Sequence, residues 1–276
     1  MSEARTEMNV VMTCAAKLAQ AEERRRPIEP LTTSFPQLTL DDAYSIQRAN
    51  IQLRTGRGDR VVGHKVGLTA TAMQELFGVH EPDYGKLLHS MVHDPDDALD
   101  LGELIDPQIE VEPAFVLGRR LSGPGVRANQ VLAAIDFVSV CFEIIDSRII
   151  DWRIRIQDTV ADNGSSARVV LGAQKFKPAD IALDNLEAIL ELDGVAMEHG
   201  NTSAILGHPA TSVAWLANTL SKFGVALEPG DIVLPGTCMR SRRIAGHRSA
   251  TGRIASLGEV TLRLDNAPFV KPSRPG

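Results

Sequence analysis

Three glutamates have the residue type and spacing needed to hold a metal ion. Glu110 and Glu112 lie in the alternating apolar segment 108–118, a pattern typical of a β-strand. Both carboxylates would then point to one face of the strand, roughly 7 Å apart. Glu143 is the charged residue of a second apolar run, 137–145, where an unpartnered carboxylate is costly to bury. We therefore expect Glu143 to have a partner.

Each of these carboxylates also has a less specific explanation. An alternating strand with two outward glutamates is most often a solvated face, and Glu143 could pair with an arginine such as Arg148. Because no Cys or His stands at ligand spacing, a bound ion would be a hard cation, Mg²⁺ or Mn²⁺. The spacing indicates such a site but does not decide between the ion and the solvated face.

Lys65 and a polar turn are the next candidates for chemistry. Lys65 lies between Gly63 and Gly67 in an apolar segment, and glycine in a strand indicates close approach of another group. The lysine could bind a substrate carboxylate, act as an acid or base with a lowered pKa, or pair with a surface acid. Residues 158–166 form a polar turn that could hold a carboxylate, although Asn, Gly and Ser are also ordinary turn formers.

Composition limits the class of protein. The chain has 276 residues, of which 43% are hydrophobic and 23% charged, as in ordinary globular proteins. Its net charge of −6 argues against a nucleic-acid binder. No apolar run approaches the ~18–20 residues of a membrane span, and the three scattered cysteines fit a reducing cytoplasm. We expect a cytoplasmic protein without nucleic-acid or membrane partners.

Hydrophobic periodicity predicts two sections. A helix is expected from Thr39 to Gly56, with Asp42 completing a capping box, and an earlier amphipathic helix joins it in an N-terminal helical section, residues 1–58. Residues 59–270 are predicted to form an α+β domain with a mixed sheet or roll, because helices interrupt its strands irregularly. Its predicted strands are 60–68, 107–118, 136–146, the hairpin 186–199, 231–235 and 253–264.

Seven short motifs lie in order along the chain, over roughly residues 40–260. They are GHKVGLT at 63–69, GVHEPDYG at 78–85, PQIEVEPAFVL at 107–117, FEIIDSR at 142–148, DTVADNGSS at 158–166, GHP at 207–209 and PGDIVLPG at 229–236. Each motif is weak by itself, but all of them in register are specific. On these motifs the chain resembles the 2-hydroxypenta-2,4-dienoate hydratase and 4-oxalocrotonate decarboxylase family, within the fumarylacetoacetase-like superfamily.

The resemblance implies a fold and a set of site residues. The family fold is a mixed β-roll with an N-terminal helical section. Members usually form homo-oligomers, so a homo-oligomer is expected, and a neighbouring pathway enzyme is a candidate partner. Lys65 would contact the substrate and move protons, Asp83 is the acid of the PDYG turn, and Ser165 lies in the turn that holds the substrate carboxylate. The implied ligands of Mg²⁺ or Mn²⁺ are Glu110, Glu112 and Glu143.

The chain departs from the family pattern at two places. Gly164 stands where alanine is common, which is a minor change. Glu259 stands in a Gly-Glu-Val sequence where Gly-Ser-Val is common, so it adds a carboxylate at the end of a strand. The sequence leaves open whether Glu259 faces the site.

The resemblance also implies a reaction. A lyase of this family hydrates 2-hydroxypenta-2,4-dienoate, or its 2-oxo tautomer, to 4-hydroxy-2-oxopentanoate in the meta-cleavage degradation of aromatic compounds. The metal would stabilise an enolate at C2, with Lys65 and Asp83 as acid and base. The close alternative is 4-oxalocrotonate decarboxylase, favoured if a basic side chain holds a second carboxylate. The candidates for that role are Arg127, Arg148 and Arg153. A catalytically silent stabilising subunit is a remote alternative, since it would not need Lys65 and the acids.

Overall fold

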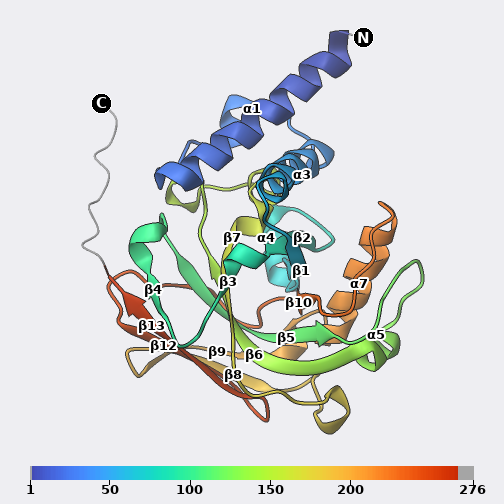
Figure 1. Ribbon diagram of the computed structural model, residues 1–276, viewed down its shortest axis with the longest axis vertical. Coiled ribbons are helices and arrows are strands. Elements are labelled where there is room, and N and C mark those ends of the chain that lie inside the picture. Colours follow the sequence, from blue (N-terminus) through green and yellow to red (C-terminus); the bar gives the residue numbers. More distant parts are fainter. Residues whose placement is uncertain (1, 267–276) are drawn as a thin grey trace.

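Helices form the N-terminal part of the chain in the computed structural model, which describes residues 2–266. They are α1 (Ser2–Arg24), α2 (Leu31–Ser34) and α3 (Leu40–Gly56), and Figure 1 shows α1 and α3 together at one end of the molecule. The predicted capping box is confirmed: the Asp42 N–H donates to the Thr39 hydroxyl at 3.1 Å, and the Thr39 N–H donates to the Asp42 carboxylate at 2.9 Å. No helix among these residues is long and apolar enough to cross a membrane.

The helical section shares an apolar cluster with the rest of the chain. The cluster joins Leu18 of α1, Leu31 of α2 and Ile46 of α3 to residues much later in the sequence, among them Ile149 and Val160. Burial of such side chains is the main favourable contribution to folding. This cluster contains residues from both sides of residue 58. The division of the chain at that residue stays a prediction. The predicted end of the second section, residue 270, lies outside the described residues.

The first sheet has eight strands and carries the residues singled out above. Seven strands follow the order β2-β1-β10-β5-β6-β7-β3. The eighth strand, β11, pairs with the first residues of β5, Gln108 and Ile109. The β1–β10 and β3–β7 pairs are parallel and the other pairs are antiparallel, so the sheet is mixed. The strands are β1 (Val61–Gly67), β2 (Asp83–Leu88), β3 (Val92–His93), β5 (Gln108–Leu117), β6 (Ile135–Ile145), β7 (Ser166–Leu171), β10 (Ile232–Leu234) and β11 (Arg242–Arg243).

A second sheet packs against the first. Its five strands follow the order β4-β13-β12-β8-β9. They are β4 (Ala98–Asp100), β8 (Glu187–Leu192), β9 (Val195–Asn201), β12 (Ser249–Ile254) and β13 (Gly258–Asp265). The predicted hairpin is confirmed, since Asp193 and Gly194 both have positive φ, at 51° and 78°, between β8 and β9. The largest core cluster fills the space between the sheets, with Phe115 and Phe142 fully buried.

Shorter helices connect the strands. They are α4 (Thr71–Phe77), α5 (Ala128–Ala134), α6 (Ile156–Ala161) and α7 (Pro209–Ser221). Single 3₁₀ turns occur at His89–Met91, Leu101–Glu103, Ile150–Trp152, Asn163–Ser165, Pro178–Asp180 and Thr202–Ala204. In Figure 1, α5 and α7 lie side by side near one end of β5 and β6. The α+β fold with a mixed β-roll and N-terminal helices is therefore confirmed.

Gly63→Ala should destabilise the protein by roughly 1–3 kcal/mol or more, because an added methyl group would overpack the β1–β10 contact. A Cβ at Gly63 would lie 1.8 Å from the carbonyl oxygen of Ile232 on β10. Gly56→Ala is the matched control, since a Cβ there meets no atom within 4 Å. Urea unfolding of both variants checks this, and equal stability of the two variants would contradict it.

Candidate metal and active site

The three glutamates meet on one face of the first sheet. The β5–β6 register sets Glu110 directly opposite Glu143 and Glu112 opposite Cys141. One carboxylate oxygen from each glutamate lies within 4.8 Å of the other two. Glu112 and Glu143 are buried, and Glu110 is partly buried. The solvated-face explanation is therefore wrong for Glu112, and Glu143 is buried as the sequence predicted.

Burial and mutual repulsion make these carboxylates hard to ionise. Burial first, and the Glu143 carboxylate second, raise the pKa of Glu110 to about 8. The same two causes raise the pKa of Glu112 well above its ordinary value. Burial also raises the pKa of Glu143, although Lys65 opposes the rise. Neither oxygen of Glu143 has a hydrogen-bond partner within the described chain. The cluster therefore contains more acid groups than the one lysine beside it, Lys65, can neutralise.

A divalent cation fits this cluster. It would supply positive charge beside the Glu143 oxygens, which lack a hydrogen-bond partner in the described chain. An all-oxygen donor set suits hard cations such as Mg²⁺, Ca²⁺ and Mn²⁺. Among residues 2–266, Glu110, Glu112 and Glu143 are the group of metal-ligating side chains that comes together in this way. These are the three residues that the family resemblance implied as metal ligands, and metal binding by them stays a prediction.

A backbone N–H orients one of the three carboxylates. The N–H of Gly236 donates to an Oε atom of Glu112 at 2.8 Å. Gly236 follows β10 with a φ of +118°, and a Cβ there would collide with Thr69 at 2.4 Å. The PGDIVLPG motif contains this glycine, but its role follows from the close approach of two segments distant in sequence. Gly236 is thus a site residue that the sequence analysis missed.

Lys65 lies against the glutamates from β1. Its Nζ is 3.6 Å from an Oε atom of Glu143, and the side chain is buried. Burial by itself would lower the pKa of Lys65, but the surrounding carboxylates, Glu143 and Asp83 first, raise it above the ordinary value. Lys65 is therefore a cation here, which is opposite to the lowered pKa considered from the sequence. The alternative of a surface ion pair is wrong.

Asp83 completes the group from the first position of β2. It pairs across the ladder with Gly67, and a Cβ on Gly67 would lie only 2.1 Å from the Asp83 Oδ1. The glycine thus makes room for the carboxylate, as the glycines around Lys65 predicted. Asp83 is buried, its Oδ1 has no hydrogen-bond partner in the described chain, and burial raises its pKa against the effect of Lys65.

Only the second half of the predicted polar turn is a turn, because α6 continues to Ala161, and this half reaches the site through its backbone. Asn163, Gly164 and Ser165 all have positive φ, at 58°, 61° and 55°. A Cβ on Gly164 would lie 2.9 Å from the Cε of Lys65, so the turn packs on the lysine stem. The Ser165 hydroxyl donates to Asp162 at 3.1 Å inside the turn. Ser165 is thus near the site, and its contact with a substrate carboxylate stays a prediction.

A buried ion pair supports this turn. The guanidinium of Arg148 donates to the Asp162 carboxylate at 2.5 Å and to the Asp162 carbonyl at 2.6 Å, and Asp162 also accepts from the Arg148 N–H. The alternative pairing of Arg148 with Glu143 is therefore wrong. The sequence analysis missed this pair, because the partner of a buried arginine depends on the fold.

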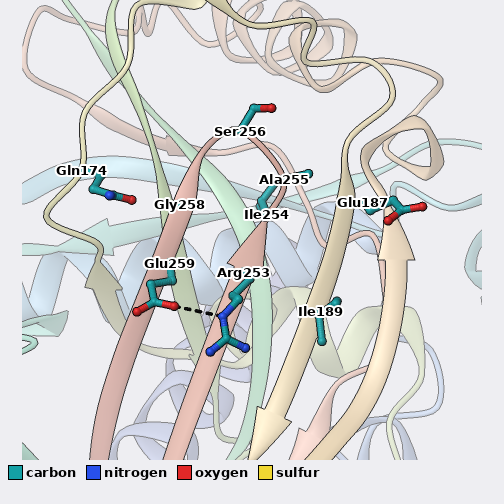
Figure 2. A pocket seen from close by; sticks show the side chains of 9 residues that line it. All are labelled: Gln174, Glu187, Ile189, Arg253, Ile254, Ala255, Ser256, Gly258 and Glu259. Carbon is teal, nitrogen blue, oxygen red and sulfur yellow. Dashed lines mark hydrogen bonds and ion pairs between the residues drawn. The ribbon is translucent and has the colours of Figure 1, made fainter.

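Glu259 lies outside the site. Figure 2 shows it beside Arg253 at a surface pocket of about 480 Å³ on the second sheet. The Arg253 Nε is 2.9 Å from a Glu259 oxygen, and about half of the Glu259 side chain is exposed. The carboxylate added at this strand end therefore does not join the three glutamates.

Comparison with known proteins agrees with the fold. The family model for the fumarylacetoacetate (FAA) hydrolase C-terminal region matches residues 75–264. The chain belongs to this family.

Individual relatives are close over most of their length. A 2-hydroxyhexa-2,4-dienoate hydratase of Comamonas testosteroni is 43% identical over 82% of this chain and 87% of its own length. A 2-hydroxypent-2,4-dienoate hydratase of Pseudomonas putida is 44% identical over 76% and 95%. The solved structure of 4-oxalocrotonate decarboxylase from Pseudomonas putida G7, complexed with magnesium and adipate, has a TM-score of 0.88 and 35% identity, covering 92% of this chain and 97% of that chain.

The metal-free protein should become less stable as the pH rises from about 4.5 to about 8. Over this range the folded state holds the Glu110 proton more tightly than the unfolded state does, because its folded pKa is about 8 instead of 4.5. We expect a loss of more than about 1.4 kcal/mol, the equivalent of one pKa unit. The raised pKa of Lys65 changes the free energy of unfolding only at higher pH. Urea unfolding in EDTA at several pH values, repeated with Mg²⁺, measures this. Metal-free stability that rises with pH would contradict it.

Glu110→Gln should weaken Mg²⁺ or Mn²⁺ binding about tenfold or more, because the variant removes a candidate ligand. It should leave the fold intact and stabilise the metal-free protein at pH 8, because one buried like charge disappears. Glu228→Gln, at an exposed ion pair with Arg120, is the control. Calorimetric titration with each metal tests the prediction. Full metal affinity and full metal-dependent activity in Glu110→Gln would exclude the three-carboxylate site.

Proposed function

We propose that this protein is a metal-dependent lyase that hydrates 2-hydroxypenta-2,4-dienoate, or its 2-oxopent-4-enoate tautomer, to 4-hydroxy-2-oxopentanoate. The observation that carries the proposal is the cluster of three glutamates with Lys65 against it and Asp83 beside Lys65. Relatives at 38–44% identity that are named as hydratases of such dienoates support this substrate class.

Glu110, Glu112 and Glu143 would hold the cation, and Mg²⁺ or Mn²⁺ suits their oxygens. When bound, the cation would supply Lewis-acid polarisation of the C2 oxygen of the substrate. Magnesium in the related decarboxylase structure supports a divalent ion of this kind.

Lys65 and Asp83 would move the protons. Lys65 is held as a cation by the surrounding acids, which suits it to deliver a proton to C5 of the dienol as the 2-hydroxyl group loses its proton. This step gives an α,β-unsaturated 2-oxo acid. Asp83 is buried beside Lys65, and its unpartnered Oδ1 could take a proton from water as the water oxygen adds to C4. A proton returned to C3 completes the product. Ser165 and the turn around it would contact the substrate carboxylate.

The second candidate function is decarboxylation of 4-oxalocrotonate, favoured by the structural similarity to that decarboxylase. This dicarboxylate needs a second cationic contact. Arg148 is committed to Asp162, Arg153 is exposed and pairs with Glu29 at 2.8 Å, and Arg127 is exposed at the start of α5. In the described part of the chain, Lys65 is the basic side chain that lies against the acids. We therefore favour the hydratase.

The remaining parts of the proposal concern the setting of the enzyme. Three free, buried cysteines and the net charge of −6 support a reducing cytoplasm and no nucleic-acid partner. A homo-oligomer, with or without a neighbouring pathway enzyme, stays a proposal from the family resemblance. A catalytically silent subunit is disfavoured, because burying four carboxylates and a lysine together is costly without a function.

Purified protein with Mg²⁺ or Mn²⁺ should consume 2-hydroxypenta-2,4-dienoate without releasing CO₂, and EDTA should abolish the reaction. Loss of the diene absorbance and a CO₂ assay measure this, with 4-oxalocrotonate as the parallel substrate. Lys65→Met should lower kcat by at least about 100-fold, the scale of acid–base catalysis. Faster CO₂ release from 4-oxalocrotonate would make the protein a decarboxylase, and turnover of neither compound would exclude both functions.

A further inference from the structure

Two buried side-chain amides bridge the elements that carry the proposed acid–base residues. One amide belongs to Gln47 of the N-terminal helix α3, and the other to Asn163 of the strained turn. Neither residue carries chemistry of its own in the proposed reaction. Both form hydrogen bonds with backbone groups close to Asp83 and Lys65.

Gln47 ties the N-terminal section to the site. Its side chain is buried, and its Nε2 donates to the carbonyl oxygens of Tyr84 and Val160, both at 3.0 Å. Tyr84 follows Asp83 in β2, and Val160 lies in α6, just before the strained turn. One amide group therefore holds the start of β2 against the end of α6. Hydrogen bonds to backbone groups in such a dry environment are costly to break.

Asn163 makes a second bridge, which joins the turn after α6 to β2. Its Oδ1 accepts from the N–H of Lys86 at 2.8 Å, and its Nδ2 donates to the Lys86 carbonyl oxygen at 2.9 Å. The backbone of β2 and the backbone of the turn approach closely here. A Cβ added to Gly85 would lie only 2.6 Å from the Asn163 carbonyl oxygen. The next residue of the turn, Gly164, then packs on the Lys65 side chain.

Backbone groups are the main support of the two reacting side chains, and the Gly67 N–H is among those that interact with the Asp83 carboxylate. Asp83 stands at the first position of β2 and its Oδ1 has no hydrogen-bond partner in the described chain. The Nζ of Lys65 is 3.6 Å from Glu143, which is longer than a hydrogen bond. Their alignment therefore depends on the backbone of β2 and of the turn. The candidate metal ligands lie on β5 and β6, and the hydrogen bonds of the two amides go to β2 and α6 instead.

We propose that Gln47 and Asn163 form an amide clamp and are positioning residues for Asp83 and Lys65, so that the N-terminal helical section takes part in catalysis through Gln47. The clamp rests on the proposed proton-transfer roles of Lys65 and Asp83. A small displacement of an acid–base group is enough to lower a rate substantially. The clamp acts on proton transfer and leaves metal binding alone.

Gln47→Met should lower kcat about tenfold, equivalent to about 1.4 kcal/mol, because methionine keeps the size of the side chain but removes both donated bonds. The KM for the dienoate and the Kd for Mn²⁺ should stay within about twofold, and the pH profile of kcat should shift as the Lys65–Asp83 pair loosens. Gln52→Met is the matched control, because Gln52 is exposed on the same helix. Wild-type kcat and pH profile in Gln47→Met, even with a lower melting temperature, would reduce Gln47 to a structural role and overturn the proposal.

Asn163→Asp tests the second bridge, and it decides the matter if Gln47→Met does not fold. Aspartate keeps the acceptor for the Lys86 N–H and loses the donor to the Lys86 carbonyl. We expect a lower kcat with unchanged Mn²⁺ affinity, and unchanged kcat would overturn the clamp.

A readout that needs no turnover separates the clamp from the proposed function. Acetylation of Lys65 by acetic anhydride, followed by mass spectrometry, should be faster in both variants than in wild type. If the wild type does not hydrate the dienoate, the proposed function is wrong. The rate of Lys65 acetylation still tests the clamp in that case. Equal Lys65 labelling in wild type and both variants would overturn the clamp.

Discussion

The site depends on burying like charges close together. Glu110, Glu112 and Glu143 bring carboxylate oxygens within 4.8 Å of one another, and Asp83 adds a fourth buried acid. Lys65 supplies one positive charge against them. A fold can keep such a cluster only if the surrounding core offsets the cost of burial and the negative charge is neutralised, either by protonation or by a further cation. The broad packing between the two sheets provides the first condition, and a divalent metal fits the second.

Backbone groups do much of the positioning around this cluster. Gly67 makes room for the Asp83 carboxylate, Gly164 lets the strained turn reach the Lys65 stem, and Gly236 lends its N–H to Glu112. In each case a side chain at the glycine would collide with the group that is held. The amides of Gln47 and Asn163 extend this arrangement, because they bond to main-chain atoms on both sides of the reacting pair. Rigid backbone elements hold catalytic groups more closely than loops do.

Much of the candidate site could be predicted from local patterns. Alternation in β5 predicted that Glu110 and Glu112 share a face, and the apolar run around Glu143 predicted a buried acid in need of a partner. The glycines around Lys65 indicated a close contact there, and family resemblance added Asp83 and a role for Lys65, which the structure brings beside the same acids. The lowered pKa considered for Lys65 was wrong, because the number of carboxylates around a lysine depends on strands far apart in sequence.

The sequence by itself determined the elements: period-two alternation specifies strands, a capping box begins α3, and Asp193-Gly194 turns a hairpin. Tertiary structure decided which elements meet. The β5–β6 register set Glu143 opposite Glu110, the fold directed Arg148 to Asp162 instead of to Glu143, and Glu259 fell on the second sheet, away from the site. The reason is physical. Backbone periodicity is a local property, whereas the partner of a buried charge is chosen by strand register and close packing between distant segments.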